Sequence, residues 1–200
     1  MLIRLAFFSC SDLPEDLTAV ISALPFGEAE RARLVAIRNG NAKRESLSAL
    51  LALRSLCALE DLTILRDENG KPRFSADGAP QFSLSHAGGL AVAAICEQAS
   101  IGVDLELARN TMNPAAVAAR FFTEAEQKEF SEQGDFFALW TKKEAKAKCL
   151  GVPLPSVLSS DLALSTRTYR CGEFTLSLAA EEAFSVEFLN DFSQIQEVLL

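Results

Sequence analysis

Two apolar runs near the middle of the chain constrain its fold more than any other feature. Leu90–Cys96 is apolar throughout, and Ile101–Glu106 places an apolar side chain at every second position. The polar segment Glu97–Ser100 separates the two runs. Short apolar or alternating runs divided by a polar turn are typical of two strands that fold back on each other. The sequence therefore predicts a β-hairpin at the centre of the chain.

Strand and helix patterns occur on both sides of this centre. In the first half, alternation and apolar stripes predict strands at Leu2–Phe8, Thr63–Arg66, Phe74 and Gln81–Ser85, and helices at Glu15–Ala23 and Asn41–Leu59. In the second half, capping signals and alternation predict helices from Thr123 to about Gln133 and from Asp135 to near Gly151, then strands at Phe174–Leu178 and Phe184–Phe188. Both halves mix the two element types, with a break near residue 100. We therefore expect an α+β fold in two lobes, residues 1–100 and 101–200.

The composition limits the partners and the cellular location. Hydrophobic residues make up 49% of the chain and charged residues 23%, which is enough to bury a core and excludes a wholly disordered protein. A formal net charge of −8 argues against nucleic-acid binding, because that affinity comes mostly from Lys and Arg. The apolar runs are too short to span a membrane, and Asp12 comes too early for a signal peptide. We expect a cytoplasmic protein whose five cysteines are reduced and mostly buried.

The segment IGVDLE, residues 101–106, places two acids in an apolar strand. Because strand side chains alternate between faces, Asp104 and Glu106 share a face with Gly102, which is expected to open space beside them. Two carboxylates about 7 Å apart on one strand face suit a hard cation such as Mg²⁺. The alternative is a strand whose acidic face simply points to solvent.

The segment WTKKEAKAK, residues 140–148, gathers charge on one helix face. Trp140, Glu144 and Lys148 are four residues apart and share that face, and Lys143 adjoins Glu144. A carboxylate in this position can bind metal or accept a proton beside an anionic substrate. The alternative is an ordinary surface helix, in which such a Glu–Lys pair contributes about 0.2–0.5 kcal/mol.

The segment FSLSHAGG, residues 82–89, places Ser85 and the only histidine, His86, at a strand end before two glycines. A hydroxyl, an imidazole and flexible backbone together suit a bound phosphate. The chain lacks the Gly-rich Lys-Ser/Thr pattern of a P-loop. A structural or incidental histidine is the alternative.

Taken together, these segments resemble the 4′-phosphopantetheinyl transferase superfamily, specifically its broad-specificity, surfactin-synthetase-activating type. The matching segments keep the family's order: NGKPRF (69–74), FSLSHAGG, IGVDLE, RFFTEAE (120–126) and WTKKEAKAK. The resemblance implies a monomer with a pseudo-twofold pair of similar lobes in one chain and the active site in the cleft between them. The first lobe would contact coenzyme A, and the second would carry the metal-binding acids and the catalytic helix.

The resemblance also implies a reaction of the holo-[acyl-carrier-protein] synthase type. A serine of an apo acyl or peptidyl carrier protein would receive the phosphopantetheine arm of coenzyme A, with Mg²⁺ bound and 3′,5′-ADP released. Asp104, Glu106 and Glu144 match the family's metal-binding acids. Glu144 is the candidate to take the serine proton, directly or through a metal-bound water, and Lys148 to stabilise or protonate the leaving phosphate.

Further positions are expected to contact coenzyme A. They are Ser85 and His86 at the pyrophosphate, Lys71 and Pro72 at the adenine end, Arg44 at the 3′-phosphate, and Lys143 beside the anionic substrate. Two other hypotheses stay open: a Mg²⁺-dependent phosphohydrolase acting on a coenzyme A-like nucleotide, and a non-catalytic protein that binds coenzyme A or a carrier. The sequence identifies neither the carrier, nor the tolerance for acylated coenzyme A, nor a preference between Mg²⁺ and Mn²⁺.

Overall fold

The computed structural model describes residues 1–58, 62–108, 113–158, 160, 162–190 and 195–198. In the first half the elements are β1 (Leu2–Ser9), η1 (Cys10–Asp12), α1 (Thr18–Ser22), α2 (Gly27–Ala36), α3 (Gly40–Leu56), β2 (Ile64–Arg66), β3 (Pro72–Phe74), β4 (Gln81–Ala87) and β5 (Leu90–Cys96). In the second half they are β6 (Ile101–Leu107), α4 (Pro114–Phe121), α5 (Glu124–Gln133), α6 (Phe136–Leu150), η2 (Leu154–Ser156), β7 (Ser165–Cys171), β8 (Phe174–Ala180), β9 (Ser185–Phe188) and β10 (Ile195–Val198). This mixture confirms the predicted α+β class.

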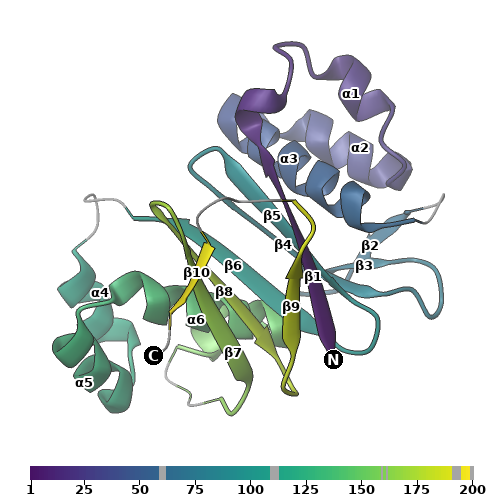
Figure 1. Ribbon diagram of the computed structural model, residues 1–200. Helices are drawn as coiled ribbons and strands as arrows, with labels where there is room; N and C mark the ends of the chain where they lie inside the picture. Colours follow the sequence, from purple (N-terminus) through teal and green to yellow (C-terminus); the bar gives the residue numbers. More distant parts are fainter. Residues whose placement is uncertain (59–61, 109–112, 159, 161, 191–194, 199–200) are drawn as a thin grey trace.

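Two four-stranded sheets lie at the centre of the described structure (Figure 1). The first sheet has the strand order β4-β5-β1-β9, and the second has the order β10-β7-β8-β6. Strand β9 comes from the second half of the chain but pairs in parallel with β1 of the first sheet. The first sheet therefore draws on both ends of the chain, and the division at residue 100 stays a prediction.

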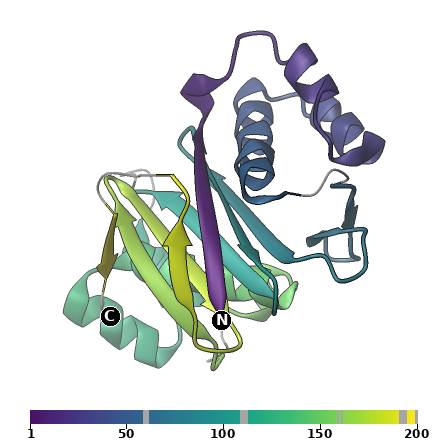
Figure 2. The same cartoon turned by 45° about the vertical axis from the view of Figure 1, so that its right-hand side comes forward.

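Each sheet has a long helix on its outer face and apolar side chains on its inner face. Helix α3 packs on β1, β4 and β5, and helix α6 packs on β6 and β8. Figure 2 shows the first-half helices gathered on the side of the first sheet that faces away from the second sheet. Along β1, Leu5 joins a buried cluster with Val103 and Leu178 of the second sheet, whereas Ala6 joins the cluster beneath α3. Because side chains alternate between the two faces of a strand, β1 contributes residues to both cores.

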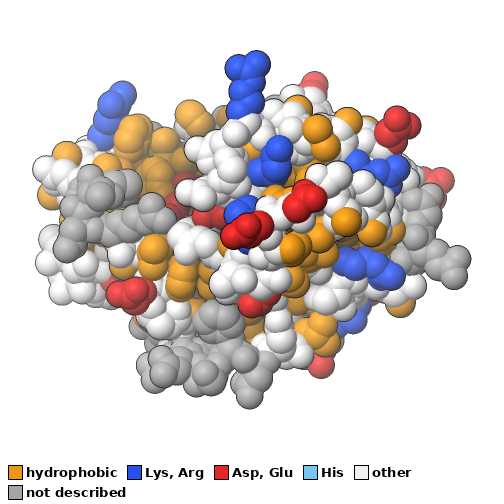
Figure 3. Space-filling model, turned by 90° about the horizontal axis from the view of Figure 1, so that it is seen from above, with side chains coloured by type: hydrophobic (Ala, Val, Ile, Leu, Met, Phe, Trp, Pro, Cys, Tyr) orange, Lys and Arg blue, Asp and Glu red, His pale blue; other side chains and the backbone are white. Residues whose placement is uncertain are grey.

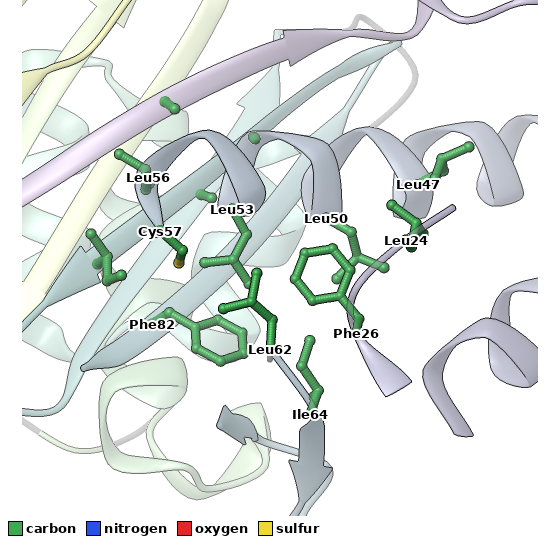
Figure 4. Packing of buried hydrophobic residues seen from close by; sticks show 14 of the residues in the cluster. Leu24, Phe26, Leu47, Leu50, Leu53, Leu56, Cys57, Leu62, Ile64 and Phe82 are labelled. Atoms are coloured by element: carbon green, nitrogen blue, oxygen red, sulfur yellow. The ribbon is translucent and has the colours of Figure 1, made fainter. Parts of the chain in front are cut away.

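The core beneath α3 is built from large apolar side chains (Figure 4). Leu50 and Leu53 of the helix pack there with Phe26, Leu62 and Phe82, all of them at most 1% exposed. Full burial of one such side chain contributes about 1.5–3 kcal/mol. This core is therefore a main source of stability in the first half.

The predicted central hairpin is wrong. Strand β5 pairs with β1 and β4, and strand β6 pairs with β8, so the segment between them carries the chain from one sheet to the other. At this junction β4 lies beside β6, where the hydroxyls of Ser83 and Ser85 accept hydrogen bonds from the backbone N–H groups of Val103 and Leu105, at 3.0 and 3.1 Å. Serine side chains thus replace a backbone ladder between the sheets.

The predicted helix signals of the second half are confirmed. Thr123 and Glu126 form the capping box of α5. The Asp135 carboxylate accepts from the N–H of Ala138 at the start of α6, and Gly151 ends that helix with φ +66°. Helices α2 and α4 and strands β7 and β10 were not expected from the sequence.

No helix of the described residues is both long and apolar enough to cross a membrane.

Candidate functional site

A cleft of about 460 Å³ lies where β4, β6 and α6 meet. Residues from both sheets line it, among them every predicted metal ligand and both predicted catalytic residues. Seen from above, the molecule carries acidic and basic side chains close together near the middle of one face, with apolar groups around them (Figure 3).

Three carboxylates converge in this cleft. Strand β6 presents Asp104 and Glu106 on the face that α6 covers, and α6 contributes Glu144. One oxygen from each of the three lies within 4.8 Å of the other two. The structure therefore brings together three acids that the sequence places in two separate segments.

Gly102 makes this approach of strand and helix possible. It was expected to open space beside the acids, but α6 fills that space. A Cβ atom built at residue 102 would lie 1.9 Å from the carbonyl oxygen of Ala145 and 2.5 Å from the nitrogen of Cys149. A side chain at this position would push α6, and Glu144 with it, away from Asp104.

The Asp104 carboxylate has one satisfied oxygen and one unsatisfied oxygen. Its Oδ1 accepts hydrogen bonds from Lys148 Nζ at 2.7 Å and from the Ser85 hydroxyl at 3.0 Å. Its Oδ2 is buried and has no hydrogen-bond partner among the described residues. Burying an anionic oxygen is costly unless a nearby positive charge or hydrogen-bond donor compensates it. Carboxylate oxygens of this kind are typical ligands of hard cations, which supply that charge. The donor set thus fits Mg²⁺.

The pKa of Glu144 is raised to about 7. Burial is the main cause, because it disfavours the charged carboxylate, and the negative charges of Asp104 and Glu106 add to it. The ammonium of Lys148 opposes them but does not outweigh them. Near neutral pH this carboxyl can therefore hold or release a proton, and a cation among the three acids would favour its charged form.

His86 lies at the end of β4 and also lines the cleft. Its Nδ1 is 3.3 Å from Glu45 Oε2, and Glu45 Oε1 accepts from the N–H of Gly89 at 3.0 Å. Burial lowers the pKa of His86, Lys148 lowers it further, and Glu45 acts in the opposite direction. Through Glu45, helix α3 fixes both the imidazole and the turn that follows it.

Lys71 and Pro72 line the same cleft. The Lys71 ammonium donates to Ser100 Oγ at 2.5 Å and to the Cys149 carbonyl at 2.6 Å, and burial lowers its pKa. A cation on the last carbonyls of a helix stabilises that end. In this structure Lys71 therefore holds the C-terminal end of α6 against the first half of the chain.

Two predicted coenzyme contacts lie elsewhere in the described structure. The Arg44 guanidinium donates to the carbonyls of Cys10, Leu13 and Pro14, at 2.9, 2.7 and 2.8 Å, and so fixes the segment that follows β1. Lys143 is 2% exposed; its ammonium lies 2.8 Å from Glu126 Oε2 and donates to the Leu158 carbonyl at 2.7 Å. One residue turns an α-helix by about 100°, which directs Lys143 away from the side that carries Glu144.

Arg33 and Arg66 line the cleft, and the sequence reasoning missed them. Both pair with Glu30, which is 3% exposed: the nearest nitrogens lie 2.7 and 3.0 Å from Glu30 Oε1. Burial raises the pKa of Glu30, but the two guanidinium groups outweigh it and hold the pKa below its usual value. No local motif marks these arginines, because they come from α2 and β2 and meet only through Glu30.

The geometry defines an acidic, cation-competent cleft where β4 of the first sheet, β6 of the second sheet and α6 meet. Comparison with known proteins identifies the family to which the chain belongs. A family model described as "4'-phosphopantetheinyl transferase superfamily" matches residues 100–197. The chain is 30% identical over 172 residues to the 4′-phosphopantetheinyl transferase AcpT of Salmonella typhimurium, covering 80% of this chain and 86% of that protein.

Two further relatives match shorter parts of the chain. The 4′-phosphopantetheinyl transferase psf-1 of Bacillus pumilus is 32% identical over 62% of this chain and 54% of its own. The 4′-phosphopantetheinyl transferase HetI of Nostoc sp. is 34% identical over 50% of this chain and 46% of its own. The chain therefore belongs to the 4′-phosphopantetheinyl transferase superfamily, and its general activity is that of a transferase.

Proposed function

We propose that this protein transfers the 4′-phosphopantetheine arm of coenzyme A to a serine of an apo acyl or peptidyl carrier protein, with Mg²⁺ bound and 3′,5′-ADP released. The observation that carries the proposal is the convergence of Asp104, Glu106 and Glu144 around a buried, unpartnered carboxylate oxygen. The proposal includes the broad-specificity, surfactin-synthetase-activating subtype, which the order of the motif segments supports. It also includes a monomer with pseudo-twofold lobes, supported by the placement of one long helix on each sheet.

The three acids would hold the metal ion. Two carboxylates at 4 Å repel each other by roughly 4 kcal/mol at an effective dielectric constant near 20, so the cluster needs a cation to be fully charged. Bound Mg²⁺ supplies positive charge that neutralises the oxygens of the coenzyme's pyrophosphate. Asp104 Oδ2 is the ligand atom most clearly free for this role, because Asp104 Oδ1 is already held by Lys148 and Ser85.

The reaction exchanges one P–O bond for another. The serine oxygen of the carrier bonds to the phosphorus next to pantetheine, the bridging P–O bond breaks, and its electron pair leaves with 3′,5′-ADP. Glu144 would accept the serine proton, and a cation held by the three acids would favour the charged form of this carboxyl, which is the form that can accept it. Lys148 brings positive charge to the leaving phosphate, and the imidazole of His86 lies on the same cleft wall. Positioning and charge neutralisation supply most of the rate in such transfers.

The nucleotide end of coenzyme A would lie toward Lys71, Pro72, Arg33 and Arg66. Among the described residues the two arginines pair with a single carboxylate, that of Glu30, so the group adds net positive charge to the cleft lining. They are better placed for the 3′-phosphate than Arg44 because they line this cleft, whereas the Arg44 guanidinium holds three backbone carbonyls outside it. Lys143 is likewise assigned to holding α5 and the segment around Leu158, on the basis of its buried contacts.

Intact-mass spectrometry tests the proposed reaction. Several apo carrier proteins are incubated with the enzyme, coenzyme A and Mg²⁺, with and without a chelator. A chelator-sensitive gain of one phosphopantetheine arm on a carrier is the expected result. Consumption of coenzyme A without any carrier gain would instead indicate the phosphohydrolase, and coenzyme A bound but intact would indicate the non-catalytic protein.

A further inference from the structure

Two serines of β4 occupy equivalent positions at the junction of the sheets. Ser83 is 5% exposed and Ser85 is 6% exposed. Each hydroxyl accepts a hydrogen bond from a backbone N–H of β6, from Val103 at 3.0 Å and from Leu105 at 3.1 Å. Each side chain therefore links the two sheets by one hydrogen bond of the same kind.

Ser85 makes two additional contacts in the cleft. Its hydroxyl lies 3.0 Å from Asp104 Oδ1 and 2.9 Å from Lys148 Nζ. The ammonium and the backbone N–H of Leu105 can only donate, so Asp104 is the acceptor for the hydroxyl proton. The direction of all three hydrogen bonds is thus fixed by the chemistry of the partners.

These contacts use the whole hydrogen-bonding capacity of the Ser85 side chain. A serine hydroxyl has one proton to donate and two lone pairs to accept with. In the described structure the hydroxyl donates its one hydrogen bond to Asp104, and its lone pairs accept from Leu105 and Lys148. A phosphate oxygen needs a hydrogen-bond donor, and the O–H group of Ser85 is already engaged with Asp104.

We propose that Ser85 is a positioning residue for the metal-binding acid and not a contact of the coenzyme's pyrophosphate. Together with Lys148, it fixes Asp104 through Oδ1, and this leaves the buried Oδ2 for the cation. Because Ser85 belongs to the first sheet and Asp104 to the second, the metal affinity depends on the junction between them. This inference rests on the proposed function, since it assigns Asp104 to a metal site.

Isothermal titration of the purified protein with Mg²⁺ tests the inference without any turnover. Groups that orient a metal ligand typically contribute 10–100-fold to affinity, so Ser85→Ala is expected to weaken Mg²⁺ binding by at least about tenfold. Ser83→Ala is the matched control: it removes the same kind of link to β6 and is expected to change Mg²⁺ affinity by less than about twofold. Thermal unfolding in chelator should show a loss for each variant, and the larger loss for Ser85→Ala, which also removes the hydrogen bonds to Asp104 and Lys148.

A second measurement separates positioning from phosphate contact. At saturating Mg²⁺, the KM of Ser85→Ala for coenzyme A is expected to stay close to that of the wild type. A raised KM with unchanged Mg²⁺ affinity would overturn the inference, because that result defines a direct phosphate contact. If Ser85→Ala does not fold, Ser85→Cys keeps the side-chain volume with a weak donor and is expected to show the same loss of affinity.

The positioning role of Ser85 and the proposed function can fail separately. Tight Mg²⁺ binding by the wild type with equal binding by Ser85→Ala would overturn the positioning role and leave the proposed function intact. Absence of Mg²⁺ binding by the wild type would overturn both the metal site and the role of Ser85 in it.

Discussion

Helices α3 and α6 each cover the outer face of one sheet, but they contact it in opposite ways. Helix α3 packs through large apolar side chains such as Leu50 and Leu53. Helix α6 packs through small residues, Ala145 and Cys149, against Gly102 and Ala179. Large side chains bury more apolar area, whereas small ones let two backbones approach closely. The first helix therefore mainly stabilises the fold, and the second mainly fixes the position of Glu144 and Lys148.

A chain of buried hydroxyls adds to the specific seating of α6. Thr141 Oγ1 lies 2.7 Å from Ser177 Oγ on β8, and Ser177 Oγ lies 2.9 Å from Thr168 Oγ1 on β7. Directional hydrogen bonds of this kind favour one orientation of a helix over slightly rotated ones. Apolar contacts discriminate less strongly between such orientations. No such chain was inferred from the sequence, because it joins three separate elements.

The substitution Gly102→Ala should disturb the packing of α6 more than any other single change. The added Cβ would overlap the backbone of α6, and the expected cost is about 3 kcal/mol or more of unfolding free energy, with loss of Mg²⁺ binding. Denaturant unfolding and isothermal titration measure the two effects. Gly40→Ala, at the start of α3, is the control, because no described atom beyond its chain neighbours and the backbone of its own helix lies within 4 Å of a Cβ there. Equal behaviour of the two variants would refute the close-packing account of α6.

The substitution Leu50→Ala should affect stability alone. This side chain is 0% exposed beneath α3, and replacing a buried leucine with alanine costs about 2–5 kcal/mol. Chemical denaturation measures this loss. The Mg²⁺ affinity of the folded variant should equal that of the wild type, and a weaker affinity would show that α3 also positions the acids.

The raised pKa of Glu144, on α6, predicts that the unfolding free energy of the protein depends on pH. Between the ordinary value of 4.5 and about 7, the metal-free native state binds more protons than the unfolded state. Its unfolding free energy should therefore fall as the pH rises through this window, by on the order of 1–2 kcal/mol. The lowered pKa of His86 acts in the opposite direction, so the comparison is made between the wild type and Glu144→Gln in chelator. Parallel pH profiles for the two proteins would contradict the raised pKa.

The substitution Ser177→Ala tests the hydroxyl chain and should have the smallest effect. It leaves Thr141 and Thr168 without their shared partner, which is expected to cost about 1–2 kcal/mol. Thermal unfolding measures the loss, and Mg²⁺ titration should show a modest decrease in affinity. An unchanged unfolding temperature would mean that the hydroxyls contribute nothing to the seating of α6.

Local periodicity was enough to predict the parts of the site that lie within one element. Alternation along β6 placed Asp104 and Glu106 on one face, and helical spacing placed Glu144 and Lys148 on another. Periodicity does not determine which strands pair, so the central hairpin was wrong: β5 and β6 find their partners in different sheets. Strand pairing depends on distant segments such as β8, which a local pattern does not identify.

Contacts between elements explain the remaining differences. Lys143 was grouped with Glu144 because they are adjacent in sequence, but the helix turn sends its ammonium to Glu126. Arg33 and Arg66 carry no motif and are recognised only from their shared contact with Glu30. The full use of the Ser85 hydroxyl likewise needs three partners from two other elements.

The most direct test of the account is the reaction of Glu144→Gln measured by intact-mass spectrometry on an apo carrier protein that the wild type modifies. The account predicts no gain of the phosphopantetheine arm, together with a cooperative thermal transition like that of the wild type, because the substitution keeps the shape of the side chain and removes its charge. Transfer at the wild-type rate by a folded Glu144→Gln variant would contradict the assignment of chemistry to the acidic cluster on β6 and α6.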